Sequence, residues 1–233
     1  NKEGMIRKAP TLGWHNVDLK KELLAKLPLP ALAKNDANAA ALAELSFGAR
    51  IGYSDLCVLF LNFGAGAGII SERKLFRGYS GLAGEIGHLG LSPTNHRRDE
   101  EIGSFERCLG RDNLLASYQS AGGKAKDLAG FLEDLKGNGV AARKVAKEWA
   151  DWLALAISNL ADIANPRLIV LAGPMSEIYP FVETGVRRQL ADRRFPTVEE
   201  LEIELSAFGE DCAALGGAAL VFNELFGAPE TST

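Results

Sequence analysis

Two stretches decide the fold of this chain, NDANAAALAE at residues 35–44 and GLAGEIGHLG at residues 81–90. The first has polar residues at its start and an alanine-rich continuation, which predicts a helix from about Ala37 to Phe47. We expect Asp36 at the N-cap of this helix, because a carboxylate can accept hydrogen bonds from the free N–H groups of the first turn. Gly48 is a typical helix stop. The second stretch is glycine-rich, which predicts a loop that approaches a neighbour or a ligand closely.

Between these stretches lies an apolar segment, Asp55–Phe63, with the sequence DLCVLFLNF. Its β-branched, aromatic and leucine residues are typical of a buried strand. Gly64, Gly66 and Gly68 follow it and lead into Ile69-Ile70. The pattern predicts a hairpin-like pair of strands, whose glycines allow either a tight turn or close backbone approach to a ligand.

The rest of the chain alternates helical and strand patterns. Helical spacing of apolar residues, or a short buried-strand pattern, occurs in each of the following segments. Helices are expected at Leu19–Leu27, at roughly 112–121, 125–136 and 140–164, from Gly173-Pro174 to about Leu190, and at Asp211–Phe226, and strands at Arg167–Ala172 and Glu200–Ala207. The opening residues are expected to be loop-like, and residues 78–110 loop-rich.

Composition places the chain among ordinary globular proteins. The 233 residues are 47% hydrophobic and 24% charged, and no apolar run reaches the roughly 18 residues that a membrane span needs. A net charge of −4 argues against phosphate-neutralising contact with nucleic acid. Cys57, Cys108 and Cys212 are odd in number and form no CxxC pair, which favours a reducing compartment. We therefore expect a cytoplasmic protein, and the absence of an initiator Met suggests a fragment.

The order of these motifs resembles the ROK family, which groups bacterial repressors with sugar kinases. APTLGWHNVDL, NPRLIVLAGP and CAALGGAALV extend the resemblance over most of the chain. The resemblance implies an α/β, actin/hexokinase-like (ribonuclease H-like) sugar-kinase fold with two lobes around a cleft, the small lobe being incomplete here. It divides the chain into residues 1–52 (part of the small lobe, with the sugar-site helix), 53–210 (the large lobe) and 211–233 (a C-terminal helix returning to the small lobe).

The family resemblance also implies a sugar site. Asn35 and Asp36 match the residues that bind sugar hydroxyls, and in the kinases this Asp is the base for the attacking hydroxyl. Glu85 and His88 match the sugar-binding EIGH residues, and Glu106 matches a later sugar-binding Glu in a segment that here reads GSFE. Each residue alone is more simply explained as a helix cap, a surface carboxylate or a structural histidine. Their ordered combination favours the site.

One departure from the family concerns zinc. Many members hold a structural zinc with the EIGH His and three Cys, whereas Arg97, Asp99 and Ser104 stand at the three Cys positions here. A lone histidine cannot reproduce a His/Cys₃ site, and Cys108 lies outside the pattern. We therefore expect no bound metal and no cofactor, and His88 is free to act as a sugar ligand.

A second departure concerns ATP. The family's kinases have a GTG-type phosphate loop after the strand, and Asn62-Phe63 stands at its Gly-Thr positions. The candidate phosphate loop of Gly64, Gly66 and Gly68 could cradle an anion, but such a short glycine pattern is equally typical of a hairpin turn. The family's first phosphate motif, DxGxT, is absent from this chain, as is a recognisable helix-turn-helix.

These features favour one function over two others. The preferred hypothesis is the sugar-binding effector domain of a ROK-type transcriptional regulator, not catalytic, which contacts DNA only through a domain outside this chain. The alternative is an ATP-dependent sugar kinase of glucokinase or N-acetylhexosamine kinase type, with Asp36 as catalytic base and ATP with Mg as cofactors. A third reading is an interaction module with a decayed site. A homodimer or higher homo-oligomer and no membrane partner are expected, and neither the sugar nor the DNA operator can be read from the sequence.

Overall fold

A central strand buried on both faces organises the structure. The computed structural model describes residues 5–9, 13–27, 29, 31–48, 52–90, 104–193 and 201–226. Strand β3 (Leu56–Leu61) is buried at every position. Its side chains alternate between two cores: Cys57, Leu59 and Leu61 enter one, and Leu56, Val58 and Phe60 enter the other. Because successive strand residues point to opposite faces, a continuous apolar run requires cover on both sides.

The sheet around β3 is mixed. Its strand order is β5 (Lys74–Phe76), β4 (Ala65–Ser71), β3, β6 (Leu168–Ala172) and β7 (Glu202–Leu205). The β3–β4 and β4–β5 pairs are antiparallel, while β3–β6 and β6–β7 are parallel. The antiparallel half comes from hairpins, and the parallel half requires helical crossovers.

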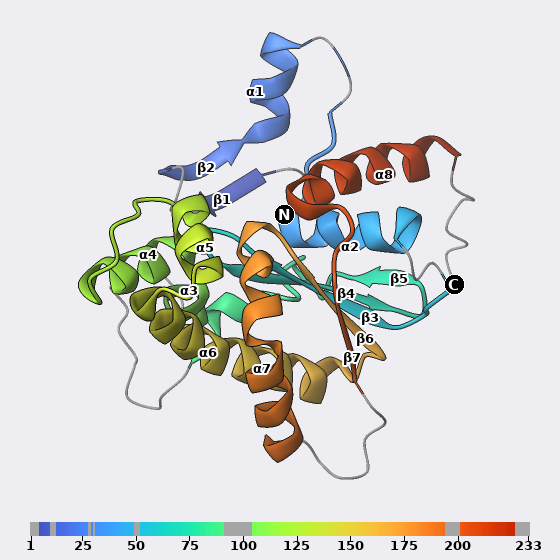
Figure 1. The fold of residues 1–233 in the computed structure, drawn as a ribbon. Helices are drawn as coiled ribbons and strands as arrows, with labels where there is room; N and C mark the ends of the chain where they lie inside the picture. Colours follow the sequence, from blue (N-terminus) through green and yellow to red (C-terminus); the bar gives the residue numbers. More distant parts are fainter. Residues whose placement is uncertain are drawn as a thin grey trace.

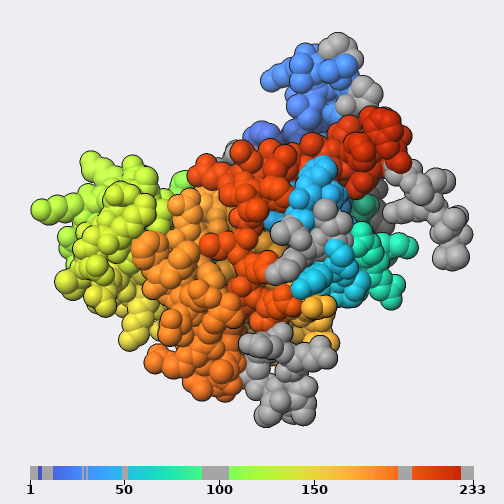
Figure 2. All heavy atoms as spheres, turned by 45° about the vertical axis from the view of Figure 1, so that its right-hand side comes forward, coloured from blue at the N-terminus to red at the C-terminus, as the bar shows by residue number. Residues whose placement is uncertain are grey.

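Helices cover the two faces of this sheet. Helices α2 (Asp36–Phe47) and α8 (Cys212–Phe226) lie on one face, and α6 (Val140–Ala164) and α7 (Tyr179–Arg193) lie on the other (Figure 1). Figure 2 shows the red atoms of α8 against the blue atoms of α2. Their close approach depends on Gly216, where a Cβ atom would overlap the backbone carbonyl of Ala39.

The shorter elements complete the fold. They are β1 (Met5–Ala9), β2 (Trp14–Asp18), α1 (Leu19–Lys26), η2 (Ile86–His88), α3 (Ser104–Leu109), α4 (Arg111–Ser120), α5 (Leu128–Lys136), η3 (Pro174–Ile178) and η4 (Gly209–Asp211). The expected helices and strands are confirmed within a few residues. The loop-like start was wrong: β1 and β2 form an antiparallel pair whose mixed polar pattern gave no clear period. The loop-rich prediction for residues 78–110 missed the short helices η2 and α3.

The start of α2 also differs from the prediction. Asn35, not Asp36, is the N-cap, since its Oδ1 accepts a hydrogen bond from the backbone N of Asn38 at 3.0 Å. The helix ends at Gly48 as expected. The lobe boundaries stay a prediction, although α2 and α8 pack on the same sheet face. Among the described residues, no helix is both long and apolar enough to cross a membrane.

Candidate functional site

The loop before η2 is clamped against β4, and this places Glu85. The backbone N of Ala67 donates to the carbonyl of Gly84 at 2.8 Å. Gly84 has a φ of +88°, and a Cβ atom there would overlap the Ala67 carbonyl. A Cβ atom on Gly87 would likewise come too close to the carbonyl of Ala65. The two glycines of GEIG are therefore required for the close approach that holds Glu85 at the carboxyl side of the sheet.

The start of α2 supplies two polar residues, of which the Asp36 carboxylate acts electrostatically on Glu85. Asn35 uses its side-chain oxygen for the helix cap, so its amide NH₂ group has no role in the cap. Asp36 accepts a hydrogen bond from the backbone N of Ala37 at 2.8 Å, and both Asn35 and Asp36 are exposed. The positive end of the helix dipole favours a carboxylate at this position. The helix start thus presents an amide donor and a carboxylate acceptor to solvent.

Electrostatic coupling brings four predicted site residues together. Partial burial raises the pKa of the Glu85 carboxyl. The interaction with His88 opposes this rise, while the carboxylates of Asp36 and Glu106 raise the pKa further. We call Asp36, Glu85, His88 and Glu106 the carboxylate–histidine cluster. Since mutual repulsion of carboxylates falls with distance, their effect on Glu85 indicates one shared site.

Helix α3 contributes Glu106 to this cluster. Its Oε2 lies 4.0 Å from Nε2 of His88, and both side chains are partly exposed. The Glu106 side chain packs over Gly64, where a Cβ atom would collide with the carboxylate. Phe105 and Leu109, on either side, are fully buried and anchor the short helix. The position of Glu106 is thus fixed by packing against Gly64 and by the buried side chains of its own helix, since its contact with His88 is too long for a strong ion pair.

The turn after β3 is a tight hairpin. Leu61 pairs with Ala65, and the backbone N of Asn62 donates to the carbonyl of Gly64 at 2.9 Å. The Phe63 ring is half exposed and lies under the Arg111 guanidinium, whose carbon is 3.9 Å from the ring centroid. Such cation–π contacts stabilise by roughly 0.5–1 kcal/mol at exposed sites. The hairpin alternative of the sequence analysis is confirmed.

The candidate phosphate loop needs a correction. Gly66 and Gly68 lie inside β4 and not in a loop. A Cβ atom on Gly66 would press on Ala37, and one on Gly68 would overlap Ala41 and the Ala37 carbonyl. These glycines let α2 approach the sheet, so they have a packing role. Of the three, Gly64 alone lies in the turn, and anion binding there stays a prediction.

The described residues do not offer a zinc donor set. No group of three or more His, Cys, Asp or Glu within the described ranges is arranged to hold a metal. Arg97 and Asp99 lie outside the described residues, and of Ser104 only the backbone is described. Burial raises the pKa of the Cys108 thiol, which disfavours the thiolate that zinc requires. The predicted loss of the family's zinc site stays a prediction.

The sequence analysis missed two residues beside the site. Lys34 directly precedes Asn35, and burial lowers the pKa of its amino group, with a further lowering by Arg77. Asn38 is buried, and its Oδ1 has no hydrogen-bond partner among the described residues. Their adjacency to Asn35 in the sequence was the available signal.

The chemical capacity of the site follows from its donors and acceptors. Three carboxylates and one imidazole interact electrostatically at this site, and the exposed Asn35 amide directly precedes Asp36. A ligand with several hydroxyl groups can donate to each carboxylate and accept from the amide or imidazole. Hydrogen bonds to charged groups are worth about 1.5–3 kcal/mol each, so a polyhydroxyl compound suits this arrangement better than an anion.

Known proteins share the sequence pattern. The ROK family model matches residues 1–224. The chain is 27% identical to the xylose repressor of Bacillus spizizenii over 219 residues, which is 91% of this chain and 56% of the repressor. It is 30% identical to the glucokinase of Halalkalibacterium halodurans over 243 residues, which is 94% of this chain and 71% of the glucokinase. The chain therefore spans little more than half of the repressor.

Solved structures share the fold. A ROK family glucokinase from Streptomyces griseus, in complex with glucose and AMPPNP, superposes with a TM-score of 0.83 at 24% identity, covering 94% of this chain and 77% of that chain. A ROK family transcriptional regulator, a homologue of the E. coli Mlc protein, gives 0.82 at 22% identity, covering 97% and 60%. The expected actin/hexokinase-like α/β fold is thereby confirmed.

Proposed function

Because the chain belongs to the ROK family, we propose that it is the sugar-binding effector part of a sugar-responsive transcriptional regulator and performs no phosphoryl transfer. The observation that carries this proposal is the turn after β3. A Phe side chain and a glycine covered by the Glu106 carboxylate occupy the place of the family's phosphate loop, while Asp36, Glu85, His88 and Glu106 interact electrostatically.

The turn is poorly suited to a phosphate group. Phe63 offers no hydroxyl and stacks with Arg111, so both side chains are already engaged. The Glu106 carboxylate lies against Gly64, and a negative charge at this position repels an incoming phosphate. Phosphate loops work through free backbone N–H groups and nearby cations. The residues of this turn are therefore a poor fit for the phosphates of ATP.

Sugar binding would act through the elements that carry the cluster. Asn35 and Asp36 belong to α2, Glu85 to the loop on β4, and Glu106 to α3. A sugar that forms hydrogen bonds to all of these elements favours the conformation in which the elements lie closest together. The ratio of the sugar's affinities for this conformation and for a more open one sets how far the conformational equilibrium shifts. DNA contact belongs to a domain outside this chain, and a homodimer suits such a regulator.

The kinase alternative rests on Asp36. This carboxylate is exposed at the first turn of α2 and close enough to Glu85 to raise the pKa of that residue. A carboxylate within reach of a sugar hydroxyl could remove its proton during attack on ATP with bound Mg. This alternative needs a phosphate site that the β3–β4 turn does not supply.

Calorimetry and a turnover assay separate the two functions. The full chain is titrated with glucose, xylose and N-acetylglucosamine, and ADP release is followed with ATP and Mg under the same conditions. We expect saturable binding of one sugar without turnover, and loss of binding in Glu85→Gln. Glu133→Gln, an exposed acid on α5, is the matched control and should bind normally. Turnover that Asp36→Asn abolishes would establish the kinase, and no binding of any sugar would refute both functions.

A further inference from the structure

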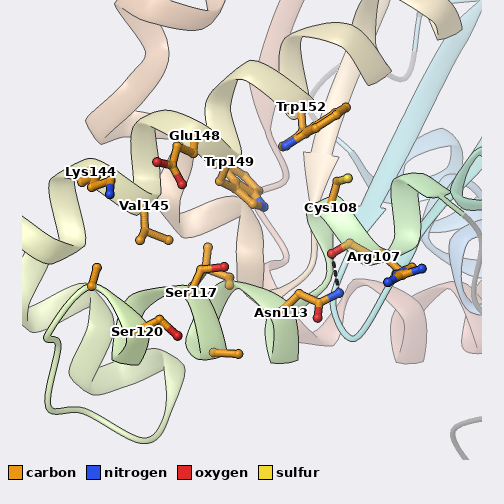
Figure 3. Close-up of a pocket in the computed structure, with 13 residues that line it drawn as sticks. Arg107, Cys108, Asn113, Ser117, Ser120, Lys144, Val145, Glu148, Trp149 and Trp152 are labelled. Atoms are coloured by element: carbon orange, nitrogen blue, oxygen red, sulfur yellow. Dashed lines mark hydrogen bonds between the residues drawn. The ribbon is translucent and has the colours of Figure 1, made fainter. Parts of the chain in front are cut away.

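A cavity lies on the opposite side of α3 from the carboxylate–histidine cluster. It measures about 610 Å³ and opens between α3, α4 and α6 (Figure 3). Glu106 faces Gly64 and His88, while the next two residues, Arg107 and Cys108, line this cavity. Its volume lies within the roughly 300–1,000 Å³ typical of small-molecule sites. Helix α3 therefore lies between the carboxylate–histidine cluster and this cavity.

The rim of the cavity consists of two facing rows of polar side chains. On α4, Asn113, Ser117 and Ser120 recur at helical spacing, and on α6, Lys144 and Glu148 recur one turn apart. Figure 3 shows the α4 row facing the α6 row across the opening. The rim contains hydroxyl, amide, ammonium and carboxylate groups, which together donate and accept hydrogen bonds. The single cation and single anion on α6 leave that wall without net charge.

The floor of the cavity is aromatic. Trp149 is buried, and its ring is fixed by a hydrogen bond from Nε1 to the carbonyl of Leu109 at 3.1 Å. Trp152, one turn further along α6, is 37% exposed and lines the cavity. An exposed tryptophan beside a polar rim offers a flat apolar surface with polar groups around it. On this helix, Trp152 contrasts with Ile163, which is exposed but lies outside the cavity.

We propose that this cavity is an accessory site for a neutral carbohydrate. A sugar ring has an apolar C–H face, which packs on Trp152, and hydroxyl groups that can bond Ser117, Ser120 and Glu148. An anionic ligand would gain Lys144 but meet Glu148, and a peptide would need a longer groove. Arg107 on α3 is a second cation in the lining, but Figure 3 shows its guanidinium directed away from Lys144 and Glu148. The opposite charges of Lys144 and Glu148 and the aromatic floor together favour an uncharged polyol.

Fluorine NMR on the tryptophans tests this site directly. The chain has three tryptophans, Trp14, Trp149 and Trp152. The full chain is labelled with fluorotryptophan, the resonances are assigned with Trp→Phe variants, and glucose, xylose and maltose are titrated at millimolar concentrations. We expect at least one sugar to shift the Trp152 resonance saturably and to leave that of Trp14 in place.

Three variants separate the cavity from the cluster. Ser117→Phe, which fills the cavity from an exposed helix position, should abolish the saturable Trp152 shift, and Ile163→Ala should preserve it. Glu85→Gln disables the cluster and should also preserve the shift, so failure of the proposed function leaves this test intact. No saturable shift with any sugar, persistence of the shift in Ser117→Phe, or its loss in Glu85→Gln would each overturn the accessory site.

Discussion

The side chain of Glu106 occupies the space that a Cβ atom on Gly64 would need. This contact joins α3 to the turn after β3, and it sets the position of Glu106 beside His88. Gly64, for which the sequence left a phosphate loop and a hairpin turn as alternatives, therefore gives the Glu106 side chain its place in the carboxylate–histidine cluster. The turn and the cluster are parts of one site.

Gly64→Ala should weaken sugar binding more than it weakens the fold. The new methyl group would displace the Glu106 carboxylate, which costs one charged hydrogen bond to the ligand, about 1.5–3 kcal/mol. Calorimetry should show roughly a tenfold to hundredfold loss in affinity. Gly52→Ala is the control, because no atom lies near its Cβ position, and it should bind as the parent does. If the two variants bound sugar with equal affinity, Glu106 would not be a sugar ligand.

Glu85→Gln should stabilise the free protein at neutral pH while it abolishes sugar binding. Partial burial raises the folded-state pKa of this carboxyl, so the folded state binds more protons than the unfolded state above the ordinary value of 4.5. The free energy of unfolding therefore falls as the pH rises through the folded-state pKa and the Glu85 carboxyl loses its proton. Urea unfolding across this range should show a shallower pH dependence in the variant. An unchanged slope would assign the pH dependence to other groups.

Glu44 makes a second, structural contribution to pH dependence. It is buried in α2, and Ser206 donates to its Oε1 at 2.6 Å. Burial raises its pKa, the hydrogen bond opposes this, and Glu204 raises it further. Its folded pKa is above the ordinary value, so its destabilising effect appears as pH rises.

Glu44→Gln keeps the acceptor for Ser206 and removes the buried charge, so it should increase the free energy of unfolding between about pH 6 and about pH 8. Glu44→Ala should decrease it, because it leaves a cavity and an unpaired hydroxyl, at about 1–3 kcal/mol. Denaturant unfolding of the two variants measures both effects. A loss of stability in Glu44→Gln would show that the ionised form is required.

Two neighbouring glycines of α8 should respond in opposite directions. Gly216→Ala forces a methyl group into the Ala39 carbonyl, and such overpacking costs about 1–3 kcal/mol. Gly217→Ala meets no atom and should stabilise the helix by up to about 1 kcal/mol. Thermal unfolding of both variants checks the pair. Similar effects at the two positions would mean that α8 can move away from α2.

Some of the fold could be predicted from local pattern alone. The apolar run of β3 predicted a strand with two covered faces, and the Trp-bearing stripe predicted α6, because hydrophobic periodicity reports burial directly. The β1–β2 pair could not be predicted in this way, since both strands are mixed in polarity and β2 is partly exposed. The short helix α3 was missed because six residues hold too little periodic signal.

The candidate site, like the fold, has features that the sequence predicted and features that only the structure shows. Asn35, Asp36, Glu85, His88 and Glu106 were named from sequence motifs, and the coupling of four of them is a finding of the structure. The packing of Gly66 and Gly68 against α2 could not be predicted, because a glycine pattern does not tell which atoms approach the missing side chain. That information depends on contacts with α2.

The sequence by itself determined the family, the buried strands and long helices, and the identity of the polar residues, because these depend on residue type and local order. Only the tertiary structure decided that Asn35 caps α2, that Glu106 covers Gly64, and that α3 separates the carboxylate–histidine cluster from a cavity with a tryptophan floor. Each of these joins segments distant in the chain or depends on side-chain direction, and packing fixes such relationships only after the chain has folded.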